Sequence, residues 1–305
     1  MIAQRTLKAP VVLDGVALHS GKQVKMRLCP AQPNRGITFV RTDLNNAPEI
    51  PAHFNNVVDT QLATTLGTGV ARVATIEHLM AALQGMGIDN LTVEIDGPEV
   101  PIFDGSSAPI CKAIQEAGIQ SQAQSRTFLA LRRRIELRVG EKWAAAEPSA
   151  KFEIQGSIDW DHPAIGYQEY HYIEGETAFS EISSARTFGF LRDIEGLRRM
   201  GLARGGSLEN AVVFDEAKCI TPGGTRFPDE CARHKVLDAL GDFKLAGIGI
   251  LAFIRLHRAG HDLHRQLLAE IFKNSDHYEI VDGSGRESRR GVEMQIPVAA
   301  RWAIV

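Results

Sequence analysis

Two residue types that bind metal ions recur at helical spacing in the second half of the chain. His234 and Asp238 lie four residues apart in HKVLD, and Asp242 follows at the same interval. Because an α-helix has 3.6 residues per turn, side chains four positions apart share one face, where a histidine and a carboxylate can reach one ion. Imidazole nitrogen and carboxylate oxygen both suit zinc. On its own, however, this spacing is more typical of an ordinary His–Asp pair on a helix surface.

A second pair, Glu77 and His78, lies near the expected start of a helix in TIEHLM. A glutamate beside a metal-binding histidine can act as a general base, as catalytic zinc sites require. In isolation the simpler interpretation is a glutamate in the first helical turn, which the helix dipole favours, next to a packed histidine. Together with His234 and Asp238, however, His78 completes the three protein ligands of a catalytic zinc site. We therefore predict a zinc site with Glu77 as its base.

A third group of candidate residues is the histidine pair in GHDLH. His261, just before an expected helix, fits a general acid that works near neutral pH. His261 and His264 also have the i,i+3 spacing of a metal-binding pair, and the chemistry alone does not decide between the two. Cys231, three residues before His234, is a further candidate ligand, but a buried structural thiol is the more typical role.

The composition is that of an ordinary globular protein and excludes several functions. The 305 residues are 44% hydrophobic and 23% charged, with a net charge of −3. No basic domain or stripe indicates nucleic-acid binding. The four cysteines form no C-x-x-C pair, the N-terminus has no signal-peptide core, and no window approaches the ~20 apolar residues of a membrane span. We therefore expect a cytoplasmic protein with reduced thiols, and peripheral membrane contact stays open.

The order of the expected elements indicates an α+β fold with two similar halves. Strand-like alternation with a period near two opens the chain. In each half a histidine-bearing helix leads through a glycine turn into a strand and then another helix, in HLMAALQGMGIDNLTVEI and in HKVLDALGDFKLAGIGILAFI. Thr75 is the expected N-cap of the first helix. Helices are predicted at about 75–84, 107–117, 229–245 and 263–273.

The polar stretch QSQAQSR, residues 120–126, is the best candidate for a domain boundary. It divides the chain into an N-terminal domain of residues 1–122 and a C-terminal domain of residues 127–305. Within the second domain the apolar run GIGILAFIRL predicts a buried strand. Near its end, DGSGRESRRG is expected to form a mobile loop before a short strand, MQIPVAA.

An amphipathic run, LRDIEGLRRMGLARGGS, follows the segment SARTFGF. At helical spacing Leu191, Ile194, Leu197 and Met200 form one apolar face. Ordinary core packing is the simpler interpretation of such a face. The functional alternative is the wall of an apolar channel for an acyl chain.

These segments together closely resemble the bacterial UDP-3-O-acyl-N-acetylglucosamine deacetylases over nearly the whole chain. The ordered motifs that carry the resemblance are QRTLK, GVALHSG, TTL, TIEHLMAAL, GIDN, VPIFDGSSAP, SARTFGFLRDIE, GGSLENAVV, HKVLDALGD and GHDLH. The resemblance implies an α+β fold of two similar domains whose helices are sandwiched between the sheets. It also implies a βαβ insert at about 188–214 in the second domain, which shapes a hydrophobic passage.

The resemblance also implies a role for individual residues. The metal ligands it implies, for one zinc or ferrous ion per chain, are His78, His234 and Asp238. The catalytic residues it implies are Glu77 as general base, His261 as general acid, Asp242 steadying that acid, and Thr187 at the developing oxyanion. The residues it places against the substrate are Lys235, Phe188 and His19. The residues it places along the acyl passage are Leu18, Leu191, Ile194, Ala203, Ser207 and Val213.

The implied reaction is zinc-dependent hydrolysis of the N-acetyl group of a small acylated UDP-amino sugar by a monomeric enzyme, the committed step of lipid A biosynthesis. Two positions depart from the family pattern. His264 stands where the family often has asparagine, which puts the hydrogen bonding after His261 in doubt. Ala63 stands where some relatives have cysteine, which favours a three-ligand site. The competing hypotheses are a non-catalytic UDP-sugar or lipid-carrier binding module and a zinc amidase for another N-acetyl sugar.

Overall fold

The N-terminal sheet follows directly from the alternating pattern of the first 100 residues. The computed structural model describes residues 2–283. In the third strand, Val24, Met26 and Leu28 are buried and alternate with exposed residues, because successive side chains of a strand point to opposite faces. The sheet has five strands in the order β2 (Val11–Val16), β3 (Gln23–Pro30), β9 (Leu91–Ile95), β4 (Ile37–Arg41) and β5 (Glu49–Pro51).

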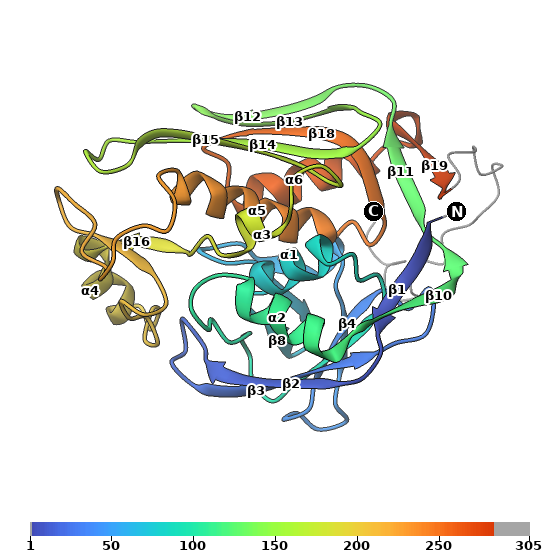
Figure 1. The fold of residues 1–305 in the computed structure, drawn as a ribbon, viewed down its shortest axis with the longest axis horizontal. Helices are drawn as coiled ribbons and strands as arrows, with labels where there is room; N and C mark the ends of the chain where they lie inside the picture. The colour runs from blue at the N-terminus through green and yellow to red at the C-terminus, as the bar shows by residue number, and fades with distance from the viewer. Residues whose placement is uncertain (1, 284–305) are drawn as a thin grey trace.

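A larger sheet of seven strands lies on the other side of the molecule (Figure 1). Its strands are β11 (Thr127–Leu131), β12 (Ile135–Val139), β13 (Lys142–Pro148), β14 (Phe152–Trp160), β15 (Gly166–Ile173), β18 (Gly249–His257) and β19 (Tyr278–Asp282). The strand predicted at β18 is found, and buried and partly buried residues alternate along it. Helices cover one face of the sheet at this strand, and the other face is partly open.

Four helices fill the space between the two sheets (Figure 1). They are α1 (Glu77–Gly85), α2 (Ala108–Ala117), α5 (Glu230–Lys244) and α6 (His261–Phe272). Helix α1 packs against α5, α5 packs against β14 and β15, and α6 packs against β12 and β13. Apolar residues of these helices and of both sheets share one hydrophobic cluster. The expected α+β class is confirmed, with helices between sheets.

The remaining elements are short. They are β1 (Ala3–Leu7), β6 (Val57–Asp59), β7 (Thr65–Thr68), β8 (Ala71–Val73), β10 (Ile119–Ser125), α3 (Ser180–Ser183), β16 (Phe188–Phe190), α4 (Leu191–Arg199) and β17 (Val212–Phe214), with 3-10 turns at Phe54–Asn56 and Ser275–His277. Strands β16 and β17 pair in parallel on either side of α4, which makes a βαβ unit. Among the described residues, no helix is both long and apolar enough to span a membrane.

Most of the predicted helices are found, with two local differences. Thr75 is not an N-cap, because its backbone has a positive φ of 56° and its Oγ1 donates to Glu99 Oε1 at 3.0 Å; Ile76 takes the cap position. The polar stretch at 120–126 is mostly strand β10, which pairs with β1. The domain boundary placed there therefore stays a prediction. The expected terminal loop and the strand MQIPVAA, beyond residue 283, lie outside the described residues.

Candidate active site

The candidate site is built where α1 crosses α5, and a glycine permits the close crossing. A Cβ atom at Gly241 of α5 would collide with the backbone carbonyl of Glu77 on α1. Without a side chain there, the two helix backbones approach closely enough for Glu77 and His78 to face the polar side of α5. Residues from opposite halves of the sequence therefore meet in the middle of the molecule.

The three predicted metal ligands converge at this crossing. His78 Nε2 lies 3.5 Å from Asp238 Oδ1, and His234 Nε2 lies 3.3 Å from the same oxygen. The candidate ligand atoms all lie within 4.8 Å of one another, and all three side chains are buried. A buried cluster of two imidazoles and one carboxylate is the donor set that suits a catalytic zinc ion.

Local hydrogen bonding prepares these residues to bind a cation. Asp238 Oδ1 is buried and has no hydrogen-bond partner among the described residues. The Nδ1–H of His234 donates to the Ala185 carbonyl at 3.0 Å, which leaves the lone pair of Nε2 facing the carboxylate. Burial lowers the pKa of His234 to about 3, so this imidazole stays neutral, as a metal ligand must. The chemistry of the three residues fits a divalent metal ion.

Lys235 connects the ligand cluster to the edge of the site. Its Nζ donates to Asp238 Oδ2 at 2.8 Å and lies 5.9 Å from the centre of the Phe188 ring. Burial alone would raise the pKa of Asp238, but His234 and Lys235 hold it well below its usual range. Asp238 is therefore ionised, and its second oxygen is left for a cation.

Glu77 stands beside the ligand cluster as the only carboxylate that α1 contributes among its described residues. The backbone N–H of Thr64 donates to its Oε2 at 3.0 Å. Its side chain is buried, and this burial raises the pKa of Glu77 above its ordinary value. A carboxylate whose pKa is shifted toward neutrality is better suited to accept a proton than an exposed one.

Asp242 accepts hydrogen bonds from both histidines of the GHDLH segment. His261 Nδ1 donates to Asp242 Oδ2 at 2.7 Å, His264 Nδ1 donates to the same oxygen at 2.8 Å, and Thr64 Oγ1 donates to Oδ1 at 2.6 Å. Burial alone would lower the pKa of His261, but Asp242 raises it to about 9. His261 therefore carries a proton at neutral pH. Because Asp242, His261 and His264 also form a group whose ligand atoms lie within 4.8 Å, the alternative of a metal-binding pair stays open.

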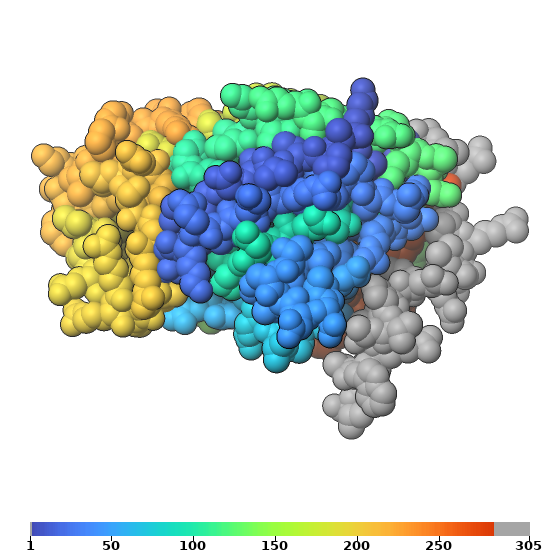
Figure 2. Space-filling model, turned by 90° about the horizontal axis from the view of Figure 1, so that it is seen from below, coloured from blue at the N-terminus to red at the C-terminus, as the bar shows by residue number. Residues whose placement is uncertain are grey.

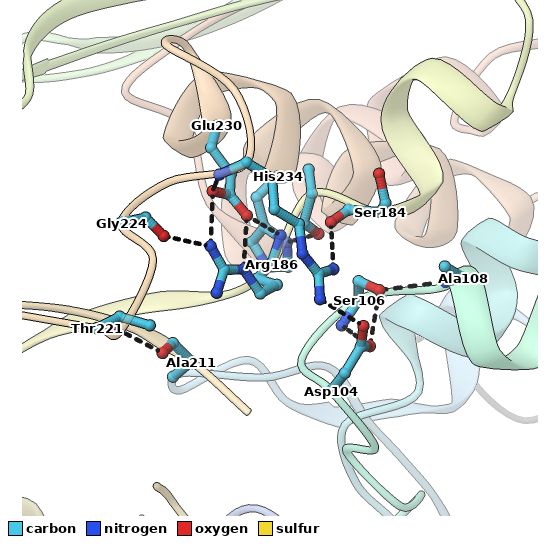
Figure 3. A network of polar contacts seen from close by, with 12 residues as sticks. Asp104, Ser106, Ala108, Ser184, Arg186, Ala211, Thr221, Gly224, Glu230 and His234 are labelled. Carbon is cyan, nitrogen blue, oxygen red and sulfur yellow. Dashed lines mark hydrogen bonds and ion pairs between the residues drawn. The ribbon is translucent and has the colours of Figure 1, made fainter. Parts of the chain in front are cut away.

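A buried ion pair that was not predicted supports the segment before Thr187. The Arg186 guanidinium donates to both oxygens of Glu230, at 2.9 and 3.1 Å, and to the Gly224 carbonyl (Figure 3). The Arg186 backbone N–H also donates to Glu230 Oε1 at 3.0 Å. These bonds fix the backbone at Arg186. The carbonyl of the preceding residue, Ala185, accepts the hydrogen bond of His234. The ion pair therefore helps to orient His234, a predicted metal ligand, and it holds the residue directly before Thr187.

The βαβ unit of β16, α4 and β17, here called the insert, meets the hairpin between β2 and β3 that carries His19. The Arg204 N–H donates to the His19 carbonyl at 3.2 Å, and the Gly205 N–H donates to the Leu18 carbonyl at 2.9 Å. Figure 2 shows this contact as the meeting of the yellow insert with the dark blue N-terminal strands. The six expected passage residues do not share one environment: Leu191 is 51% exposed, Val213 is buried, and Leu18, Ile194, Ala203 and Ser207 are partly buried.

Some residues of the site could not be predicted from the sequence, and one predicted candidate lies outside the site. Cys231 packs in a separate apolar cluster, and burial raises the pKa of its thiol to about 12, so it is not one of the grouped ligands. Thr64, Ala185 and Arg186 were not predicted. Glu230 had a usable signal, because it lies one turn before His234 on the polar face of α5.

Comparison with known proteins agrees with this geometry. The family model for UDP-3-O-acyl N-acetylglycosamine deacetylase (LpxC) matches residues 4–273. A UDP-3-O-acyl-N-acetylglucosamine deacetylase of Myxococcus xanthus (strain DK1622) is 51% identical over 93% of this chain and 91% of its own length. Enzymes of the same name from Syntrophotalea carbinolica and Haemophilus influenzae (strain 86-028NP) are 47% and 44% identical, over 96% and 94% of this chain and 96% and 95% of their own lengths. These matches, together with the geometry of the site, show that the chain belongs to the LpxC family of UDP-3-O-acyl N-acetylglycosamine deacetylases.

Proposed function

We propose that this chain hydrolyses the N-acetyl group of UDP-3-O-acyl-N-acetylglucosamine, giving UDP-3-O-acyl-glucosamine and acetate in the committed step of lipid A biosynthesis. The observation that carries the proposal is the convergence of His78, His234 and Asp238 beside a buried carboxylate, Glu77. The names of the relatives supply the substrate. The enzyme acts as a cytoplasmic monomer on a small-molecule substrate.

The three ligands would hold one divalent cation, which we propose is zinc, with ferrous iron as the alternative. A divalent ion in an open three-ligand site supplies a Lewis acid and makes water a better nucleophile near neutral pH. The protein's part is to keep His234 neutral and Asp238 ionised. Burial and the hydrogen bond to the Ala185 carbonyl keep His234 neutral, and the Lys235 ammonium favours the ionised form of Asp238.

Two buried groups would move the protons of the reaction. Water adds to the acetamide carbonyl carbon, and Glu77 accepts the proton that this water loses. The carbon–nitrogen bond then breaks, and His261 donates its proton to the leaving amine, which departs poorly unless it is protonated. Asp242 keeps His261 protonated and oriented, and Thr187 would donate a hydrogen bond to the developing oxyanion.

The remaining predicted residues would bind the substrate around this centre. Lys235, Phe188 and His19 would contact the UDP-sugar, since Lys235 and Phe188 lie together and His19 lies where the N-terminal hairpin meets the insert. The acyl chain would follow the insert, along Leu18, Leu191, Ile194, Ala203, Ser207 and Val213. The exposed apolar side chains of this insert support the assignment.

Acetate release tests the proposal directly. The purified enzyme should release acetate from the UDP-sugar, lose activity in a chelator, and regain it when zinc is added. His234→Ala should lose both metal and activity, whereas His171→Ala, a partly exposed histidine of β15, should lose neither. Active enzyme without metal would contradict the metal site. Metal-dependent release from other N-acetyl sugars, but not from this one, would contradict the substrate.

A further inference from the structure

His264 has a place in the site that the proposed reaction does not use. It lies on α6 one turn after His261, and only 1% of the residue is exposed. Its Nδ1 donates to the Asp242 oxygen that also accepts from His261. With Thr64 on the other oxygen, Asp242 accepts three hydrogen bonds from two segments far apart in the sequence.

The direction of the hydrogen bond between His264 and Asp242 follows from its surroundings. Burial alone would raise the pKa of Asp242, but His261 and the hydrogen bonds of both imidazoles lower it to about 2, so this carboxylate is ionised and each Nδ1 carries a hydrogen. His264 Nε2 is buried with no hydrogen-bond partner among the described residues, and the Phe243 ring lies 5.7 Å from the imidazole centre. His264 is therefore a donor fixed through Nδ1.

The two histidines on Asp242 thus differ in what they can do. The charged groups facing His261 are Asp242 and Asp238 of α5 and Glu77 of α1, and all three favour its protonated form. His264 Nε2 has no hydrogen-bond partner among the described residues. The geometry therefore favours His261 for proton exchange with the substrate and His264 for holding the carboxylate.

We propose that His264 is a positioning residue, whose Nδ1–H holds Asp242 in the orientation that aims His261 at the leaving group. An aspartate carboxyl turns readily about its terminal torsion. Thr64 on Oδ1 and His264 on Oδ2 give each oxygen a donor other than His261, so the carboxylate keeps its orientation when His261 gives up its proton. The inference rests on the proposed role of His261 as the proton donor.

Three substitutions of His264 isolate its Nδ1–H. His264→Asn keeps an N–H donor close to the position of Nδ1 and removes the rest of the ring. His264→Gln carries its N–H further out, near the position of Nε2, and His264→Leu has no donor. Asn should therefore rescue the function, whereas Gln and Leu should not. If Leu fails to fold, the comparison of Asn with Gln still decides the question.

The expected kinetic result separates positioning from a general structural role. In the zinc-loaded enzyme, His264→Gln and His264→Leu should lower kcat by about tenfold or more, the usual effect of removing an orienting hydrogen bond, with KM nearly unchanged. Their alkaline limb should move to lower pH, because a poorly oriented Asp242 supports the imidazolium less well. His264→Asn should stay within about threefold of the native kcat and keep the native limb. Unchanged kcat and unchanged limb in His264→Gln would overturn the proposal.

Two further measurements separate the remaining outcomes. Proton NMR of ¹⁵N-histidine-labelled protein should show two downfield imidazole N–H signals, of which His264→Asn removes one and leaves the other unshifted. If His261→Ala keeps full activity, the proposed proton donor is wrong; if His261→Ala is impaired and His264→Leu is not, only the present inference fails. Loss of a second bound zinc ion in His264→Asn would instead show that His264 is a metal ligand, and would overturn positioning.

Discussion

Helices α5 and α4 depart from the usual rule of burial in opposite directions. Helix α5 buries charged side chains, among them Glu230, Asp238 and Asp242. Helix α4 has no buried residue, and the apolar Leu191 at its start is 51% exposed. Buried charge and exposed apolar surface are the informative exceptions in a protein. Each lowers stability, so its presence indicates that function or a partner group requires it.

What compensates each helix differs as well. Every buried acid of α5 has named partners: Arg186 for Glu230, Lys235 for Asp238, and two histidines with a threonine for Asp242. The apolar face of α4 has no equivalent cover among the described residues. The buried charges at the centre of the site are therefore paired within the protein, whereas the apolar face of α4 is left exposed or partly exposed. We expect substitutions in α5 to affect chemistry and those in α4 to affect substrate selection.

The largest effect should come from the base at the α1–α5 crossing. Glu77→Gln keeps the shape of the side chain and cannot accept a proton, so kcat should fall by about 10²-fold or more. The three ligands stay in place, so metal content should remain near one ion per chain. Acetate release and elemental analysis on the same sample check both points, with Glu94→Gln on the partly exposed side of β9 as the matched control. If metal were lost together with activity, Glu77 would be a ligand.

The sequence predicted the helices of the site well, because their residues repeat at helical spacing. It also predicted that His78, His234 and Asp238 lie together, although from the resemblance more than from spacing alone. It could not predict that Thr64 reaches Asp242 across 178 positions, since that contact depends on how the halves pack. A backbone acceptor such as the Ala185 carbonyl has no side-chain signature at all. Thr75 was predicted to be an N-cap because the local sequence does not reveal its hydrogen bond to Glu99, 24 positions further along the chain.

The pH dependence should show both proton-carrying groups at once. Burial raises the pKa of Glu77, which must be ionised, so activity should rise with pH through that raised value. Asp242 raises the pKa of His261 to about 9, and His261 must be protonated, so activity should fall as pH passes about 9. His261→Ala should lower kcat by about 10²-fold, keep the metal and remove this alkaline limb. Retention of the limb in His261→Ala would assign it to another group, and loss of metal would make His261 a ligand.

The smallest effect should come from the insert, and it should depend on the substrate. Ile194 is partly buried on α4, and an indole at this position would narrow a passage along the helix without touching the α1–α5 crossing. Ile194→Trp should therefore raise KM for a long-chain substrate by about tenfold, a cost typical of a poorly fitting apolar site, and leave kcat and a short-chain substrate nearly unchanged. Glu195→Trp adds the same indole to an exposed position of the same helix and should change neither. Equal effects of Ile194→Trp on long and short substrates would mean that α4 stabilises the fold and does not select the acyl chain. Helices α4 and α5 would then differ only in how far their side chains are exposed, and not in their roles toward the substrate.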